Sequence, residues 1–314
     1  MTRDIYRPAE YALGPVARAI EKLKSFQHGD LAVLEVVARG EAAIPALEAV
    51  LLAPEPSGLY QTRTRAVEAL AHLGAHDVLT AYLAQPHAIT DPIARLGEDA
   101  VINAAARAVA GRNDPGLFAV LQQLAQRPCL AGVIFALGAS GRSEAIPLLV
   151  AALGEDESRS IAESALKACG TVAEPGLIRA ALPLPASRGF ESESRLRQRR
   201  SALKVLTEMK GSDRLWPALR SLIHDDDARI AMTACRFAIE TGSEADRHDA
   251  VVRLVELYCA SNWSSRDDIE RCLRAHGSLV RQVKSASPEL GLLMAHLSPA
   301  ASLLGRLCLR PAPA

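Results

Sequence analysis

Residues that could support metal or acid–base chemistry are few in this sequence. Histidine and aspartate are adjacent at three places, namely His76-Asp77, His224-Asp225 and His248-Asp249. A protein zinc site needs three or four convergent ligands. Each dipeptide lies at or near a predicted turn, where aspartate is common because its side chain bonds to the backbone. We therefore expect no metal centre and no cofactor.

Motifs of nucleotide binding and nucleophilic catalysis are missing. The chain has no G-x-x-x-x-G-K-[ST] phosphate loop and no G-x-S-x-G elbow. Its six cysteines form no C-x-x-C pair, and most lie in apolar helical stretches as small hydrophobic residues. The sequence therefore predicts neither an enzyme nor a disulfide framework. Reduced cysteines and the lack of a signal-peptide run predict a cytoplasmic protein.

The densest charge feature is a basic cluster. Its members are Arg188, Arg195, Arg197, Arg199, Arg200 and Lys204. Four of them form a candidate anion-binding patch: Arg195, Arg197, Arg199 and Arg200. Nucleic acid could use such a patch for its phosphates, but single-strand binding also needs aromatic platforms, and aromatics are 4% of the chain. We favour a solvated helix face for this run, with nucleic-acid binding as the weaker alternative.

The composition indicates helices that pack closely together. Of the 314 residues, 49% are hydrophobic, and alanine and leucine dominate this set. Both are strong helix formers. The formal net charge is zero, but residues 1–157 carry 13 basic and 18 acidic side chains, whereas residues 158–314 carry 23 and 18. No run of apolar residues is long enough to span a membrane.

Glycines and prolines mark a repeat along the chain. The glycines fall about 34 residues apart on average, at Gly40, Gly74, Gly111, Gly138, Gly170, Gly211, Gly242 and Gly277. Each follows an amphipathic stretch, and glycine commonly ends a helix in a left-handed conformation. Soon after many of them, a proline opens the next helix, as Pro45, Pro115, Pro147, Pro175 and Pro217. Asp114 and Ser143 suit the N-cap.

These units resemble HEAT repeats. An Arg-bearing helix ending in A-L-x-x-L-G, as in "TRAVEALAHLG", precedes a short turn and a helix such as "AIPALEAVLL". The likeness covers about residues 30–286 and is strongest to the bacterial repeats related to phycobilisome lyases. It implies an all-α fold, a right-handed α-solenoid of antiparallel helix pairs, with an armadillo-like array as the alternative at residues 246–286. In such arrays Asp227 with Arg229, or Asp156 with Arg159, would form a ladder between repeats.

The resemblance also implies a domain plan. We expect one solenoid domain over residues 1–314, with an N-terminal cap at 1–29, about seven to eight repeats at 30–286, and a C-terminal cap and tail at 287–314. The apolar stretch 288–309 either folds back as a cap or forms an interface.

A basic groove is the predicted binding site. In HEAT arrays the second helices line the concave face. In the C-terminal half, Arg179 follows Pro175 and Arg220 follows Pro217, and the next second helices supply Arg253 and Arg281. Arginine binds carboxylates at two points. We therefore expect a non-enzymatic scaffold or adaptor that binds a protein partner with an acidic surface. The alternatives are a HEAT-type nucleic-acid or DNA-repair factor and an accessory subunit like the lyase relatives.

Overall fold

The fold is entirely helical in the part of the chain described by the computed structural model. The described residues are 14–53, 60–184, 191–260 and 263–286. They contain no β-strand, which confirms the all-α prediction. Among them, none of the helices combines the length and apolar character needed to cross a membrane. The predicted cap at 287–314 lies outside the described residues.

The chain divides into two compact units, the first ending at Cys169 and the second beginning at Gly170. The helices of the first unit are α1 (Pro15–Leu23), α2 (Gly29–Val37), α3 (Ile44–Leu52), α4 (Gln61–His72), α5 (His76–Ala84), α6 (Pro92–Ala108), α7 (Pro115–Leu124), α8 (Ala131–Ala139), α9 (Ile146–Ala152) and α10 (Arg159–Cys169). A single array over the whole chain remains a prediction.

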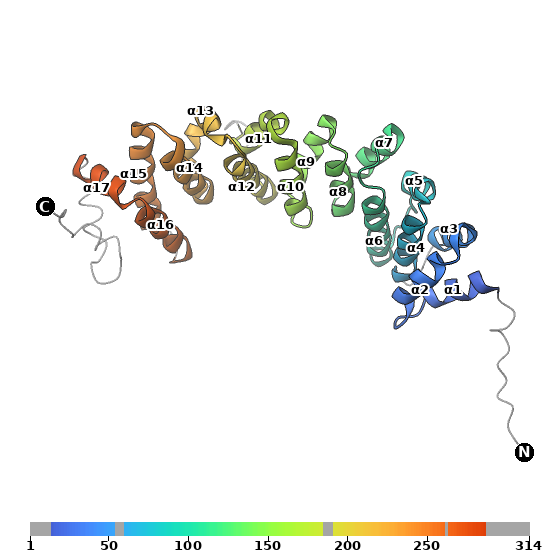
Figure 1. Ribbon diagram of the computed structural model, residues 1–314. Helices are drawn as coiled ribbons and strands as arrows, with labels where there is room; N and C mark the ends of the chain where they lie inside the picture. Colours follow the sequence, from blue (N-terminus) through green and yellow to red (C-terminus); the bar gives the residue numbers. More distant parts are fainter. Residues whose placement is uncertain (1–13, 54–59, 185–190, 261–262, 287–314) are drawn as a thin grey trace, which may run out of the picture. The chain divides into compact units, whose positions relative to one another are not determined.

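Helices of the first unit pack in two rows. One row runs α2, α4, α6, α8, α10, each in contact with the next, and the other contains α1, α3, α5 and α7 in succession. Figure 1 shows α5 and α7 on the opposite side of this unit from α4, α6 and α8. Leu47 of α3 and Leu70 of α4 are fully buried. Such a side chain contributes about 1.5 to 3 kcal/mol of burial free energy, so the packing between rows holds the unit together.

The second unit contains longer helices and a broken one. Its helices are α11 (Glu174–Ala181), α12 (Glu193–Glu208), α13 (Trp216–Leu219), α14 (Ala228–Thr241), α15 (Glu244–Ala260), α16 (Trp263–Ala275) and α17 (Gly277–Ala286), with a 3-10 helix η6 (Arg220–His224) continuing α13. Here α12 contacts α11 and α14, while α15 contacts α14, η6, α16 and α17.

Most of the predicted helix boundaries are confirmed. All five prolines stand at the first or second position of a helix. The Asp114 carboxylate accepts hydrogen bonds from the N–H groups of Gly116 and Leu117, as an N-cap should. Ser143 does not cap a helix, because it starts a 3-10 turn and its hydroxyl donates to Glu144.

Five of the eight glycines have the predicted left-handed backbone: Gly40, Gly74, Gly111, Gly170 and Gly211. Gly138 does not, because it lies inside α8, and Gly141 takes the left-handed position instead. Gly242 also departs from the prediction, with a φ of −74°. The repeat is therefore regular in spacing but not in the residue that ends each helix.

Candidate functional site

The four arginines predicted to line a groove all lie in the second unit. Arg220 begins η6, Arg253 lies on α15 and Arg281 on α17, and α15 contacts both η6 and α17. The structure thus brings these three onto adjacent elements. Arg179, on α11, is exposed, as is Arg281.

Two of these arginines have partners within the fold. The Arg220 Nε lies 2.5 Å from the buried Asp246 carboxylate of α15. The Arg253 guanidinium donates to Glu256 at 2.9 Å and to the backbone carbonyl of Asp225 at 3.5 Å. Arg220 and Arg253 therefore link η6 and the residue after it to α15, whereas Arg179 and Arg281 keep their side chains in solvent.

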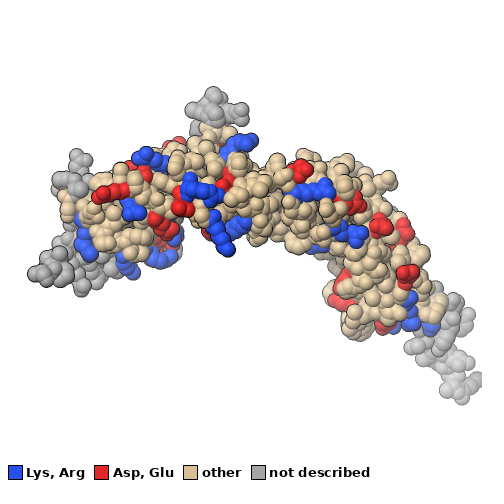
Figure 2. Space-filling model, turned by 45° about the horizontal axis from the view of Figure 1, so that its top comes forward, with Lys and Arg blue, Asp and Glu red and all other residues tan. Residues whose placement is uncertain are grey.

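Arginines of the candidate anion patch make hydrogen bonds and ion pairs within the protein. Arg195 donates to the backbone carbonyl of Leu182 at 3.0 Å and to Gln198 at 2.6 Å. Arg200 binds both carboxylate oxygens of Asp227, and Arg199 is buried. Arg197 is partly buried. On the face of the second unit visible in Figure 2, basic and acidic side chains are interspersed and form no continuous basic area. The guanidinium groups of Arg195, Arg199 and Arg200 are therefore already bound by the protein.

Arg199 occupies a position that has a counterpart in the first unit. Its Nε donates to the carbonyl of Ala181, the last residue of α11, and its other nitrogens bind Glu191 at 2.7 Å and Asp225. In the first unit the Arg63 Nε donates to the carbonyl of Leu51 near the end of α3, at 2.8 Å. Each buried guanidinium therefore takes a carbonyl that the end of a helix leaves unpaired.

The first of these sites is centred on Glu98 of α6, which is 1% exposed. Its carboxylate accepts hydrogen bonds from Arg63 at 2.5 Å, the Tyr82 hydroxyl at 2.6 Å and the His87 backbone N–H at 3.1 Å. Burial acts to raise the pKa of Glu98, but these donors outweigh it and the pKa lies below its ordinary value. Burial also raises the pKa of Tyr82. The cluster is a closed ion pair, with donors and acceptors matched inside the unit.

The sequence analysis predicted neither the Arg63–Glu98 cluster nor the Arg199–Asp225 cluster. A single sequence does not reveal that Arg63 meets a carboxylate 35 residues later. A usable signal did exist, because Arg63 stands three residues before the buried Ala66, and Arg199 stands three before the buried Ala202. An alignment of the two Arg-bearing helices on these alanines would have placed Arg63 and Arg199 at equivalent positions.

Of the two predicted Asp–Arg pairs, one has a different partner and the other forms only between residues close together in the chain. Asp227 pairs with Arg200 of α12, at 2.5 Å, while Arg229 is exposed. Asp156 and Arg159 do pair, but only three residues apart in the chain. The Asp227 carboxylate, which caps α14, also binds Arg200 of the preceding helix α12. The contact between Asp227 and Arg200 therefore joins two helices.

Replacing Asp227 with asparagine tests the charge in that contact. Burial acts to raise the pKa of Asp227, but Arg200 and two backbone N–H groups lower it below 3.8. A depressed carboxyl pKa stabilises the fold above the unfolded-state value and is lost as the pH falls through the lower folded value. Asparagine keeps the N-cap, so we expect Asp227→Asn to lose about 1 to 2 kcal/mol at pH 7, and this loss should shrink as the pH falls through the folded pKa of Asp227.

Urea unfolding of the wild type and of Asp227→Asn, measured from neutral to acid pH, gives this difference. The control is Asp213→Asn, an exposed aspartate on a neighbouring turn of the same unit. A stability gap between Asp227→Asn and the wild type that stays constant with pH would contradict the assigned role of the carboxylate.

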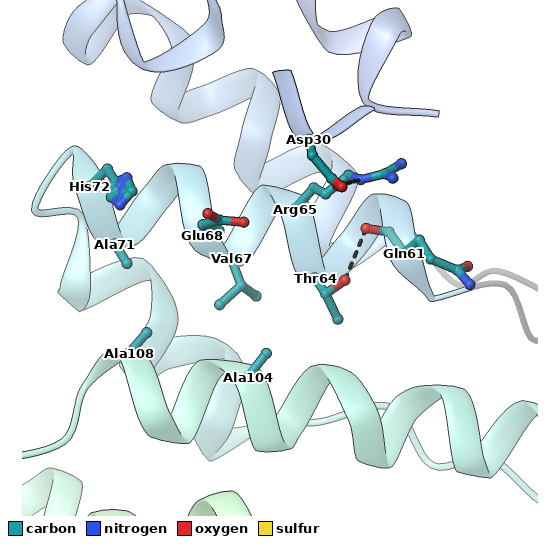
Figure 3. A pocket seen from close by; sticks show the side chains of 10 residues that line it. All are labelled: Asp30, Gln61, Thr64, Arg65, Val67, Glu68, Ala71, His72, Ala104 and Ala108. Atoms are coloured by element: carbon teal, nitrogen blue, oxygen red, sulfur yellow. Dashed lines mark hydrogen bonds and ion pairs between the residues drawn. The ribbon is translucent and has the colours of Figure 1, made fainter. Parts of the chain in front are cut away.

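A hollow of about 550 Å³ lies on the first unit, on the row of Arg-bearing helices. Ten residues from α2, α4 and α6 line it: Asp30, Gln61, Thr64, Arg65, Val67, Glu68, Ala71, His72, Ala104 and Ala108. In Figure 3, Ala104 and Ala108 of α6 face α4, across from Val67 and Ala71. Because these side chains are small, the two helices leave open space between them. The sequence analysis did not find this hollow, and its small residues were the available signal.

The basic residue of the hollow is turned away from it. Arg65 donates to Asp30 at 2.8 Å and to the backbone carbonyls of Leu23 and Ser25, also within 2.9 Å. A side chain at Gly29 would collide with the Arg65 guanidinium, so glycine permits this close approach. Arg65 therefore joins α4 to the turn between α1 and α2, and it does not pair with Glu68, the acidic residue of α4.

The His-Asp dipeptides do not form separate sites. His224 and Asp249, which come from two different dipeptides, meet at 2.9 Å on the surface of the second unit. Within the described ranges, no group of three or more histidine, cysteine, aspartate or glutamate side chains is arranged to hold a metal ion. The contact therefore joins η6 to α15, as the Arg220 pair does.

Comparison with known proteins gives no family for the chain. No protein-family model matches the chain, and no curated protein sequence is significantly similar to it.

Proposed function

We propose that the chain is a non-enzymatic scaffold or adaptor, a right-handed helical solenoid of the HEAT type, and that it binds an acidic protein partner in the cytoplasm. The observation that carries this proposal is the exposure of Arg179 and Arg281 on helices of the second unit. Arrays of helices present extended surfaces that suit protein binding.

The proposal distinguishes arginines that hold the fold from arginines that face solvent. Arg220 and Arg253 are paired with Asp246 and Glu256, so much of their charge is balanced within the fold. Arg179 and Arg281 are exposed and can form two-point contacts with carboxylates of a partner. The nucleic-acid alternative is less favoured, because its predicted phosphate contacts are mostly used inside the second unit.

Reversing the charge of the two exposed arginines tests the proposal. We expect Arg179→Glu with Arg281→Glu to lose the partner that the wild type retains on affinity capture from the source cell, because both contacts become repulsive. The matched control is Arg229→Glu with Arg236→Glu, two exposed arginines of α14 in the same unit. Mass spectrometry compares the retained proteins, and identical sets from both double variants would contradict the proposal.

A further inference from the structure

The hollow between α4 and α6 has an acidic side chain, Glu68, that pairs with no other side chain in the described part of the chain. Glu68 of α4 lines it and is exposed. We propose that this hollow binds a lysine or arginine side chain from a basic, amphipathic segment of a partner protein, with Glu68 pairing its charge. This site does not include the exposed arginines Arg179 and Arg281 of the second unit, and its charge has the opposite sign.

The arginines of the surrounding helices do not neutralise Glu68. Arg63 is directed into the buried Glu98 cluster, and Arg65 into Asp30 and two backbone carbonyls. The Arg107 guanidinium of α6 lies over the ring of Phe135 on α8, 5.3 Å from its centroid. Asp30 also lines the hollow, but its exposed carboxylate is paired with Arg65. The hollow therefore carries more acidic than basic charge toward solvent.

The shape of the hollow suits a long cationic side chain. Lysine and arginine have an aliphatic stem that packs on apolar surface while the charged end stays near water. Val67, Ala71, Ala104 and Ala108 supply that apolar surface, and Glu68 with Gln61 supplies polar groups beside it. A volume of about 550 Å³ is ample for one such side chain.

Charge and apolar surface around the hollow point to a basic amphipathic segment. Residues 1–169 carry 15 basic and 19 acidic side chains, so the unit has a formal charge of −4 and attracts positive segments. The lining helices also expose large apolar side chains, Leu31 and Leu34 on α2 and Ile93 and Leu96 on α6. A segment with leucines near its basic residue would cover such side chains, as amphipathic helices do in grooves.

A labelled peptide tests the site directly. The probe is a fluorescein-labelled helical peptide of alanine, leucine and lysine, and the charge control is the same peptide with glutamate in place of lysine. We expect the full-length protein to bind the lysine peptide in a fluorescence-anisotropy titration. Glu68→Gln should weaken this binding about tenfold, because a charged hydrogen-bond partner is lost.

Two further variants make the result specific. Ala104→Leu fills the hollow without changing charge and should also weaken binding about tenfold, whereas Glu41→Gln removes an exposed carboxylate outside the hollow and should have no effect. The Arg179→Glu, Arg281→Glu protein should still bind the lysine peptide, which separates this site from the proposed function. Equal affinity for the two peptides, or equal affinity of all three single variants, would overturn the proposal.

Discussion

Glu98→Gln is expected to destabilise the first unit by about 3 to 5 kcal/mol, a large fraction of the stability of a domain. The glutamine carbonyl oxygen can still accept from the Tyr82 hydroxyl and the His87 backbone N–H, but its NH2 group then replaces the oxygen that accepts from Arg63, so both the charge and this hydrogen bond are lost. What remains is the Arg63 guanidinium, 4% exposed and without a counter-charge. Leaving a buried charge unpaired costs far more than losing a surface ion pair.

Urea unfolding followed by far-UV circular dichroism measures this loss. The matched control is Asp30→Asn, which breaks the Arg65–Asp30 pair at a carboxylate that is 90% exposed and should cost at most about 1 kcal/mol. The double variant Arg63→Met, Glu98→Gln removes the charge from both partners. Its free energy of unfolding should fall less than that of Glu98→Gln alone. If Glu98→Gln and Asp30→Asn unfold at the same urea concentration, the buried pair has no special role.

Arg199→Met should destabilise the second unit by a similar amount, about 3 to 5 kcal/mol. The substitution leaves the Asp225 carboxylate, 7% exposed, without its arginine and removes the donor from the carbonyl of Ala181. Arg179→Met, at an exposed arginine of the same unit, should stay within about 0.5 kcal/mol of the wild type.

Tryptophan fluorescence can follow this loss in one unit alone. Both tryptophans of the chain, Trp216 and Trp263, belong to the second unit. Trp216 is buried and its ring N–H donates to Asp246 at 2.9 Å, so unfolding exposes the indole to water. If Arg199→Met proved as stable as Arg179→Met, the basic cluster would regain its interpretation as a surface patch for anions.

The helices could be predicted from the sequence because their signals are local. Pro115 stands at the first position of α7 and Asp114 caps it, and both effects need only neighbouring residues. The same reasoning identified Gly74 and Gly111 as left-handed helix ends. It failed at Ser143, where a 3-10 turn precedes α9 and replaces the expected cap.

Whether an arginine is buried in an ion pair or exposed to solvent could not be predicted, because this depends on residues far along the chain. A run of charge on a helix usually faces solvent, and Arg199 looks like its neighbours in sequence. In the structure it is buried because Asp225, 26 residues later, and the end of α11 meet it. The hollow beside Glu68 was missed for a similar reason, since it forms only where Val67 and Ala71 oppose Ala104 and Ala108.

The two buried arginines have a consequence for engineering the chain. The Arg63 side chain of α4 binds a backbone carbonyl near the end of α3, and the Arg199 side chain of α12 binds one at the end of α11. In each case a side chain connects the two neighbouring helices. Lengthening a connection costs little chain entropy when its ends are fixed in this way. The connections between α3 and α4 and between α11 and α12 are therefore suitable places to insert a fluorescent protein or an affinity tag, provided that Glu191, which binds Arg199, and Ser192, which caps α12, are kept.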